Sequence, residues 1–114
     1  MSGWFELKKT DKEKFHFVLK AGNAEIILSS EIYESKAAAE KGIASVQANS
    51  SQDERYEKKQ AKDERFYFVL KAANHQIIGQ SQFYKAEASC DKGIEAVKRA
   101  GSSDTIKDLT ADNG

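Results

Sequence analysis

The amino-acid sequence predicts an α+β fold in which tandem strand-strand-strand-helix repeats form one antiparallel sheet with two helices packed on one face. Residues 15–51 align with residues 66–102 at a constant offset of 51 residues and without a gap. Within each copy the apolar periodicity changes from that of a strand to that of a helix. One copy is too short to bury its own apolar face, so we expect the two copies to share a core about a pseudo-twofold axis.

The longest strand of each copy is marked by alternation. Apolar residues recur at every second position from Phe15 to Ala21, and the same pattern returns from Phe66 to Ala72. This two-residue period is typical of a strand with one face toward a core. The opposite face then carries side chains of mixed character, which in chain order are His16, Val18, Lys20, Tyr67, Val69 and Lys71.

Each long strand is followed by a turn and a return strand. An asparagine stands in both turns, at Asn23 and Asn74. We interpret this residue as a sign of turn geometry, because asparagine is among the few residues that tolerate a positive φ. The runs at 25–30 and 76–81 each contain an Ile–Ile pair, and they predict the second strand of a hairpin.

The helical pattern begins after Tyr33 and Tyr84. Ser35 predicts an N-cap for a helix from Lys36 to about Asn49, whereas its counterpart Ala86 cannot cap. A mid-helix glycine costs ~1 kcal/mol relative to alanine, and its presence in both helices indicates that the backbone comes close to the sheet there. The apolar stripes that contain these glycines are Ala39, Gly42, Ile43 and Val46 in the first helix and Cys90, Gly93, Ile94 and Val97 in the second.

Short leading strands are predicted near residues 4–8 and 55–59, and residues 104–110 have enough β-branched and apolar character for a final strand. The predicted order is therefore βββα–βββα plus a last strand, in a sheet of about six strands. We expect a single domain over residues 1–114, with repeat one at about 3–51, repeat two at about 54–110 and a flexible tail at 111–114.

The repeated blocks resemble those of a known family. FHFVLKAGN, IILSSEIY and SKAAAEKGIASV in the first copy, with FYFVLKAANHQII and KGIEAV in the second, are similar to the YegP-like family of small bacterial proteins. The resemblance covers the chain from Gly3 to Asp108. It implies βββα-type repeats that assemble into one sheet. It is also compatible with terminal strands that are exchanged between the repeats. It implies no activity and no catalytic residue. The departures are small: Gly22 becomes Ala73, and Gly79 stands where the first copy has Leu28.

Composition narrows the class of protein. The eighteen basic and eighteen acidic residues cancel, which argues against strong non-specific binding to nucleic acid. The N-terminal residues lack the apolar segment of a signal peptide, and no apolar run approaches the ~18 residues of a membrane span. The single cysteine, Cys90, cannot form an internal disulfide, which fits a reducing compartment. We therefore expect a cytoplasmic protein with no membrane contact.

The reactive side chains form no recognisable catalytic or metal-binding pattern. His16 stands where the second copy has Tyr67, and His75 lies in a turn opposite Ala24. One cysteine and two scattered histidines are a weak ligand set for a metal. Cys90 lies in the apolar stripe of its helix, which favours a buried, inert thiol over a nucleophile. We predict no catalytic, cofactor-binding or metal-binding residue, and a protein that is not an enzyme.

The sheet face opposite the helices is the remaining candidate site. It presents His16 and Lys20 beside Tyr67 and Lys71, and aromatic and basic side chains on an open sheet can stack bases. The same surface also suits cross-strand packing or contact with a second molecule. We favour packing or contact with a second molecule over base stacking, because RNP-type motifs are missing. The sequence thus predicts a module for protein interaction or self-association, with nucleic-acid or small-ligand binding as the alternative.

Overall fold

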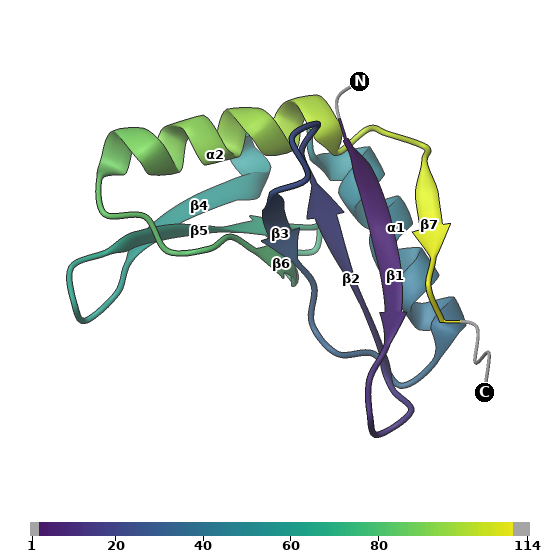
Figure 1. The fold of residues 1–114 in the computed structure, drawn as a ribbon. Helices are drawn as coiled ribbons and strands as arrows, with labels where there is room; N and C mark the ends of the chain where they lie inside the picture. Colours follow the sequence, from purple (N-terminus) through teal and green to yellow (C-terminus); the bar gives the residue numbers. More distant parts are fainter. Residues whose placement is uncertain (1–2, 111–114) are drawn as a thin grey trace.

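A seven-stranded sheet in the order β4-β5-β6-β3-β2-β1-β7 organises the fold (Figure 1). The computed structural model describes residues 3–110, and the tail predicted at 111–114 lies outside these described residues. In chain order the elements are β1 (Trp4–Lys9), β2 (Phe15–Lys20), β3 (Ile26–Ser29), α1 (Lys36–Asn49), the 3-10 turn η1 (Asp53–Arg55), β4 (Tyr56–Gln60), β5 (Phe66–Lys71), β6 (Ile77–Gln80), α2 (Glu87–Ala100) and β7 (Ile106–Asp108).

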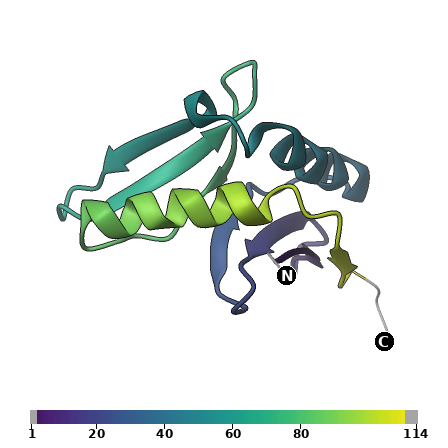
Figure 2. The same cartoon turned by 90° about the horizontal axis from the view of Figure 1, so that it is seen from above.

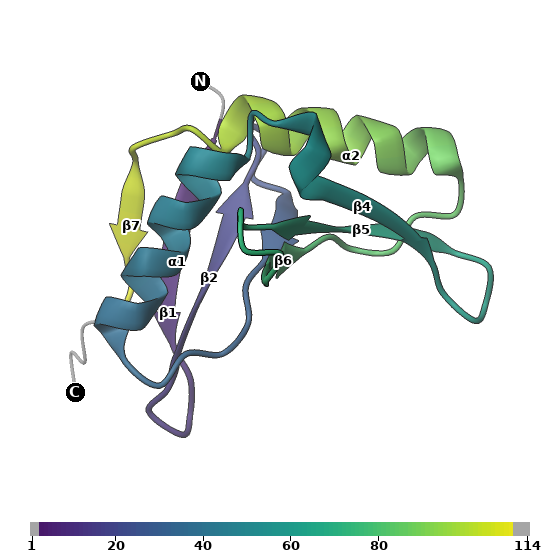
Figure 3. The ribbon, with the colours of Figure 1, turned by 180° about the vertical axis from the view of Figure 1, so that it is seen from behind.

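The predicted α+β architecture of two repeats on one sheet is confirmed, with two corrections at its edge. The sheet has seven strands among the described residues instead of about six, because the final strand joins it as β7. The sheet is also not wholly antiparallel, since β7 pairs parallel with β1. The chain that leaves α2 therefore returns to the strand that begins the first repeat, which closes that edge of the sheet (Figure 3).

The two half-sheets meet at a very short junction. β3 and β6 are antiparallel and share the single residue pair Ser29–Gln80, about which the repeats are related by a pseudo-twofold axis. Figures 1 and 2 show the strands of one half running steeply across those of the other, so that the sheet bends around a common interior. α1 contacts β1 and β2 but also β5 and β6, and α2 contacts β5 but also β2 and β3. Each helix thus packs against both repeats.

The core is formed by the side chains that the alternation and the helical stripes predict. The largest fully buried side chains are Phe5, Leu7, Phe17, Leu19, Leu28, Ile43, Val46, Phe68, Leu70, Cys90 and Val97. Cys90 is buried as predicted, and its burial raises the pKa of the thiol. Ile94, the counterpart of Ile43, is only half-buried and packs at the edge of the core.

The helix starts and the hairpin turns show how local side chains set the backbone. Ser35 caps α1 as predicted, with its Oγ accepting a hydrogen bond from the Ala38 N–H at 3.1 Å. In the first turn the residue of positive φ is not Asn23 but Ala24, at 71°. The Asn23 Oδ1 instead accepts a hydrogen bond from the Glu25 N–H at 3.1 Å. This side-chain turn holds the intervening residue in the left-handed region, and the second turn repeats the arrangement at His75.

The glycine in each helix makes room for a tyrosine. Phe15 and Tyr33 exchange backbone hydrogen bonds of 2.8 and 2.6 Å, and the Tyr33 ring stacks on Phe17 with a centroid separation of 6.2 Å. A Cβ on Gly42 would lie 2.5 Å from the Tyr33 Oη and 2.8 Å from the Phe17 ring. The close approach predicted for the helix backbone therefore involves this tyrosine as well as the sheet.

Leu28 and Gly79 occupy equivalent positions and fill one space between them. A Cβ on Gly79 would lie 2.7 Å from both the Cδ2 and the Cγ of Leu28. Leu28 is 1% exposed, so its side chain has little room to withdraw. Two leucines at these positions would overlap near the pseudo-twofold axis, and the departure from exact repetition is therefore required by packing.

We expect Gly79→Leu to destabilise the protein by about 1–3 kcal/mol, because it overfills a packed interior. The exchanged pair Leu28→Gly with Gly79→Leu keeps the summed volume and should recover a large part of that loss. Urea unfolding of the single and double variants measures both effects. Equal destabilisation by the single variant and by the exchanged pair would contradict this packing argument.

Candidate functional site

The candidate binding surface is the sheet face opposite the helices, which we call the outer face. Cross-strand pairing places Glu6 opposite Val18 and Val18 opposite Ser29. Ser29 in turn pairs with Gln80, and Gln80 with Val69. These side chains form a central row that runs across both repeats.

The central row is more closed than the sequence suggested. Val18 is 4% exposed and Val69 is 2% exposed, although both were expected to lie on an open surface. Lys20 forms an ion pair with Glu6 at 3.2 Å, and Lys71 pairs with Glu57 at the equivalent place. Long lysine side chains can cover apolar neighbours while their ammonium groups reach a partner. The two lysines of the predicted binding face are thus engaged within the chain.

Glu6 is the most highly connected charge on the outer face. Its Oε2 accepts a hydrogen bond from the Trp4 Nε1 at 2.9 Å, and Lys8 lies 3.8 Å from Oε1. The hydrogen bond from Trp4, together with the contact from Lys20, lowers the pKa of the Glu6 carboxyl. The Lys107 ammonium lies 4.4 Å from the centroid of the Trp4 ring. This network joins β7 to β1 on the outer face.

The two rings predicted for the binding face lie on that face but at opposite ends of the sheet. β3 runs antiparallel to β6, and β2 and β5 each pair antiparallel with their neighbours. The N-terminal ends of β2 and β5, which carry His16 and Tyr67, therefore point in opposite directions. Partial burial, with a contribution from the charge of Lys8, lowers the pKa of His16. The structure therefore does not bring the two rings together.

Tyr67 instead belongs to a cluster that the sequence pattern did not predict. Its ring meets Phe83 edge to face at a centroid distance of 5.1 Å. The Arg65 guanidinium carbon lies 4.6 Å from the centroid of the same Phe83 ring. Aromatic and guanidinium groups in this arrangement attract each other through the ring quadrupole. The Arg65–Phe83–Tyr67 cluster is thus an accessible aromatic surface, whose guanidinium also pairs with the Asp63 carboxylate at 2.7 Å.

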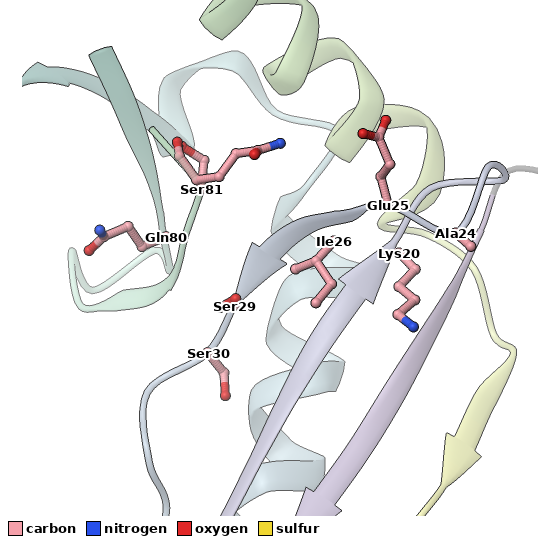
Figure 4. A pocket seen from close by; sticks show the side chains of 9 residues that line it. Lys20, Ala24, Glu25, Ile26, Ser29, Ser30, Gln80 and Ser81 are labelled. Atoms are coloured by element: carbon pink, nitrogen blue, oxygen red, sulfur yellow. The ribbon is translucent and has the colours of Figure 1, made fainter. Parts of the chain in front are cut away.

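A cleft opens where β3 and β6 diverge beyond their single residue pair (Figure 4). Its volume is about 670 Å³. Ser29 and Ser30 line it from the first repeat and Gln80, Ser81 and Gln82 from the second, and Lys20, Ala24, Glu25 and Ile26 complete the wall. The lining therefore offers hydroxyl, amide and charged groups beside one exposed apolar side chain.

Exposed apolar side chains recur at equivalent positions in both repeats. Ile26 is 43% exposed and its counterpart Ile77 is 37% exposed. Ile32 is 56% exposed and its counterpart Phe83 is 41% exposed. The sequence did carry a signal for them, because each is an apolar position that both copies retain. Four of the six large apolar residues found exposed in residues 3–110 belong to this set.

The reactive residues considered from the sequence remain separate from one another. His16 lies partly buried on β2, His75 is exposed in the β5–β6 turn, and Cys90 is a buried residue of α2. Within residues 3–110, no group of three His, Cys, Asp or Glu side chains is placed to hold a metal ion. In the same part of the chain, no helix is both long enough and apolar enough to cross a membrane.

The architecture defines the protein as a duplicated α+β domain whose two repeats share one core. Residues 11–57 and 61–108 each match the family described as Domain of unknown function (DUF1508). The chain belongs to this family. Both matched segments start just before the long strand of a repeat and contain two strands and a helix; the first ends within β4 and the second at the end of β7.

Relatives and solved structures agree with this assignment. The chain is 62% identical to the UPF0339 protein ACIAD0721 of Acinetobacter baylyi, over 96% of this chain and 99% of the relative. It is also 62% identical to the UPF0339 protein YegP of Escherichia coli K12, over 96% of this chain and 100% of the relative. The solution NMR structure of E. coli yegP matches with a TM-score of 0.93 at 61% identity, covering 99% of this chain and 97% of that one. The structure of SO3888 from Shewanella oneidensis matches with a TM-score of 0.93 at 55% identity, covering 99% and 96%. Family membership thus establishes the fold and assigns no activity.

The environment of Glu6 predicts a pH dependence. Because the folded-state pKa of this carboxyl is lowered, it contributes stability that is present above its unfolded pKa and is lost as the pH falls through the folded value. We expect Glu6→Gln to lower the urea midpoint at neutral pH and to flatten its decline below about pH 4.5. In an NMR titration, the chemical shifts of the Glu6 carboxyl and the Trp4 indole N–H should change together, at a pH below the ordinary pKa of a glutamate. Glu57→Gln, which removes the more exposed counterpart, serves as the matched control and should change the pH profile less.

Proposed function

We propose that this protein is a non-enzymatic interaction module that binds a partner protein through the outer face at the junction of its repeats. The observation that carries this proposal is the retention of exposed apolar side chains at equivalent positions of both repeats, Ile26 with Ile77 and Ile32 with Phe83. Burial of apolar surface contributes roughly 25 cal/mol per Å². Because these four side chains stay exposed, the free energy of burying them is available to a contact with another molecule.

The chemistry around these residues indicates the kind of partner that would fit. Ile26 lies in the wall of the cleft beside Ser29 and Gln80, so an apolar side chain that enters there finds hydrogen-bonding groups close by. An aromatic or aliphatic anchor with polar neighbours is the common form of a protein contact site. The pseudo-twofold relation of the exposed positions offers such a partner two related contact points.

The state of the reactive residues supports a non-enzymatic role. The Cys90 thiol is buried, and its raised pKa keeps it protonated at neutral pH. Neither histidine lies in the wall of the cleft between β3 and β6. The free, buried thiol also suits a reducing compartment, and on that ground we propose a cytoplasmic setting.

Photo-cross-linking in living cells tests the proposed contact. With the photoreactive residue p-benzoylphenylalanine in place of Phe83, we expect one discrete cross-linked protein product, identified by mass spectrometry. Adding Ile26→Ser and Ile77→Ser to the same chain should reduce that product at least severalfold, because a hydrophobic contact weakens with lost apolar area. The same photoreactive residue at the exposed helix position Glu40 is the matched control and should not give the product. Equal products from positions 83 and 40, or none from either, would overturn the proposal.

Single-stranded nucleic acid is the second candidate ligand, and the Arg65–Phe83–Tyr67 cluster favours it. Base stacking on an aromatic side chain contributes about 1–3 kcal/mol per base, and Arg65 would meet a phosphate by leaving the Asp63 carboxylate, to which its Nε donates at 2.7 Å. The pairing of Lys20 with Glu6 and of Lys71 with Glu57 removes two cations that such a ligand would use. If the face binds nucleic acid, a labelled oligonucleotide should bind in a salt-dependent manner and Phe83→Ser should abolish the signal. Flat titrations at low salt would exclude this candidate.

A further inference from the structure

The outer sheet edges of the two repeats differ in whether another strand covers them. The edge of β1 is covered by β7, with the Phe5 N–H donating to the Thr105 C=O at 2.9 Å and the Leu109 N–H donating to the Leu7 C=O at 2.8 Å. The equivalent strand of the second repeat, β4, ends the sheet on the other side. No other strand of the described residues pairs with its outer edge (Figure 3).

The backbone of β4 presents hydrogen-bonding groups at this edge. Phe68 exchanges hydrogen bonds with Ser81, its C=O accepting from the Ser81 N–H at 2.9 Å and its N–H donating to the Ser81 Oγ at 2.9 Å. Phe68 therefore faces β6, and its pairing with Lys58 is of the non-hydrogen-bonded type. The N–H and C=O of Lys58 then point away from β5, as those of its counterpart Leu7 point toward β7. A strand placed there would find a donor and an acceptor.

A hollow beside β4 is a second sign that this edge is less covered than the edge of β1. It has a volume of about 420 Å³ and lies between β4 and α2. Ile94 in its wall is half-buried, whereas the counterpart Ile43 is fully buried beside the β7-covered edge. The hollow is lined by Asp53, Tyr56, Lys58, Asp91, Lys92, Ile94, Glu95 and Lys98.

A parallel strand like β7 does not suit the β4 edge. In the first repeat the bond from the Phe5 N–H anchors β7. The corresponding N–H of Tyr56 already donates to the Asp53 C=O in the η1 turn. An antiparallel strand centred on Lys58 does not need that N–H to begin pairing. The edge therefore favours an antiparallel neighbour.

We propose that the occupant is a second copy of this chain, whose β4 pairs antiparallel with β4 about a twofold axis at Lys58. In this register the two Lys58 residues exchange backbone hydrogen bonds, and Glu57 of each copy lies opposite Lys59 of the other. A shift of two residues would place Lys59 opposite Lys59, where like charges repel. The charge pattern of the strand thus selects the self-complementary register.

The lysines at the centre of this pairing are already neutralised. The Lys58 ammonium lies 2.8 Å from a Glu87 carboxylate oxygen and 2.9 Å from one of Asp91. Two copies would therefore bring two lysines together with four carboxylates from α2. Lysines on an edge strand generally hinder pairing with another strand, so this edge suits only a neighbour that places carboxylates opposite them, as a second copy does in this register.

Charge-reversal variants test this contact. In Glu57→Lys the strand carries two positive charges on the outer face, and in Lys59→Glu it carries two negative charges. Each variant alone should self-associate roughly tenfold more weakly than the original chain, because like charges then face each other across the pair. A mixture of the two variants in equal amounts should associate again, since both pairs between positions 57 and 59 are then opposite in sign. Sedimentation velocity over a concentration series measures all four samples, the mixture included.

Controls separate this contact from others. Glu40→Lys and Lys41→Glu reverse exposed charges on α1 and should leave association unchanged. Ile26→Ser with Ile77→Ser should also leave it unchanged, which distinguishes the β4 contact from the outer-face contact proposed above. Lys58→Pro removes the outward N–H while sparing the β4–β5 hydrogen bonds, and it should abolish association with the fold retained by circular dichroism. A monomeric original chain up to about 1 mM, or a mixture that stays as weak as its components, would overturn the proposal.

Discussion

The apolar core that the two repeats share holds this molecule together, because the sheet joins the repeats through only one residue pair. The Ser29–Gln80 pair cannot fix two half-sheets on its own. α1 and α2 each pack across the junction onto strands of the other repeat, so the apolar stripe of either helix is buried only when both repeats are folded. A fold of this kind should unfold as one cooperative unit, although its sequence is that of two similar halves.

The same shared interior explains where the repetition must fail. Near a pseudo-twofold axis, equivalent side chains would occupy the same volume. Here Leu28 fills that volume, and its counterpart is Gly79, which has no side chain. Away from the axis each repeat keeps its own copy of a packing device, such as the tyrosine over the helix glycine at Gly42 and Gly93. The reason for a difference between the copies therefore depends on its place in the fold. A difference near the axis reflects side-chain packing, and a difference at a sheet edge reflects whether another strand covers that edge.

The fold could be predicted because its determinants are local and repeated. Alternation located the long strands, and Ser35 located the start of α1 to the residue. The features that the sequence did not reveal depend on contacts between distant segments. Nothing in residues 104–110 specified that β7 would pair parallel with β1, and the Glu6–Lys20 pair that helps to close the outer face joins residues that only strand register brings together. The Arg65–Phe83–Tyr67 cluster was missed for the same reason, since Phe83 lies outside every periodic segment.

The difference between the two sheet edges follows from substitutions that change together. Phe5 and Leu7 of the covered strand become Tyr56 and Lys58 on the free strand. The Tyr56 hydroxyl donates to the Ser50 C=O at 2.6 Å, and Lys58 reaches the carboxylates of α2. The charge at the helix start also reverses: Lys36, which holds Asp108 of β7 at 2.5 Å, becomes Glu87. In each case an apolar or cationic group that suits a covered edge is replaced by one that tolerates water and can still meet a charged neighbour. The free edge is thus lined by polar and charged side chains, whereas the covered edge is part of the core.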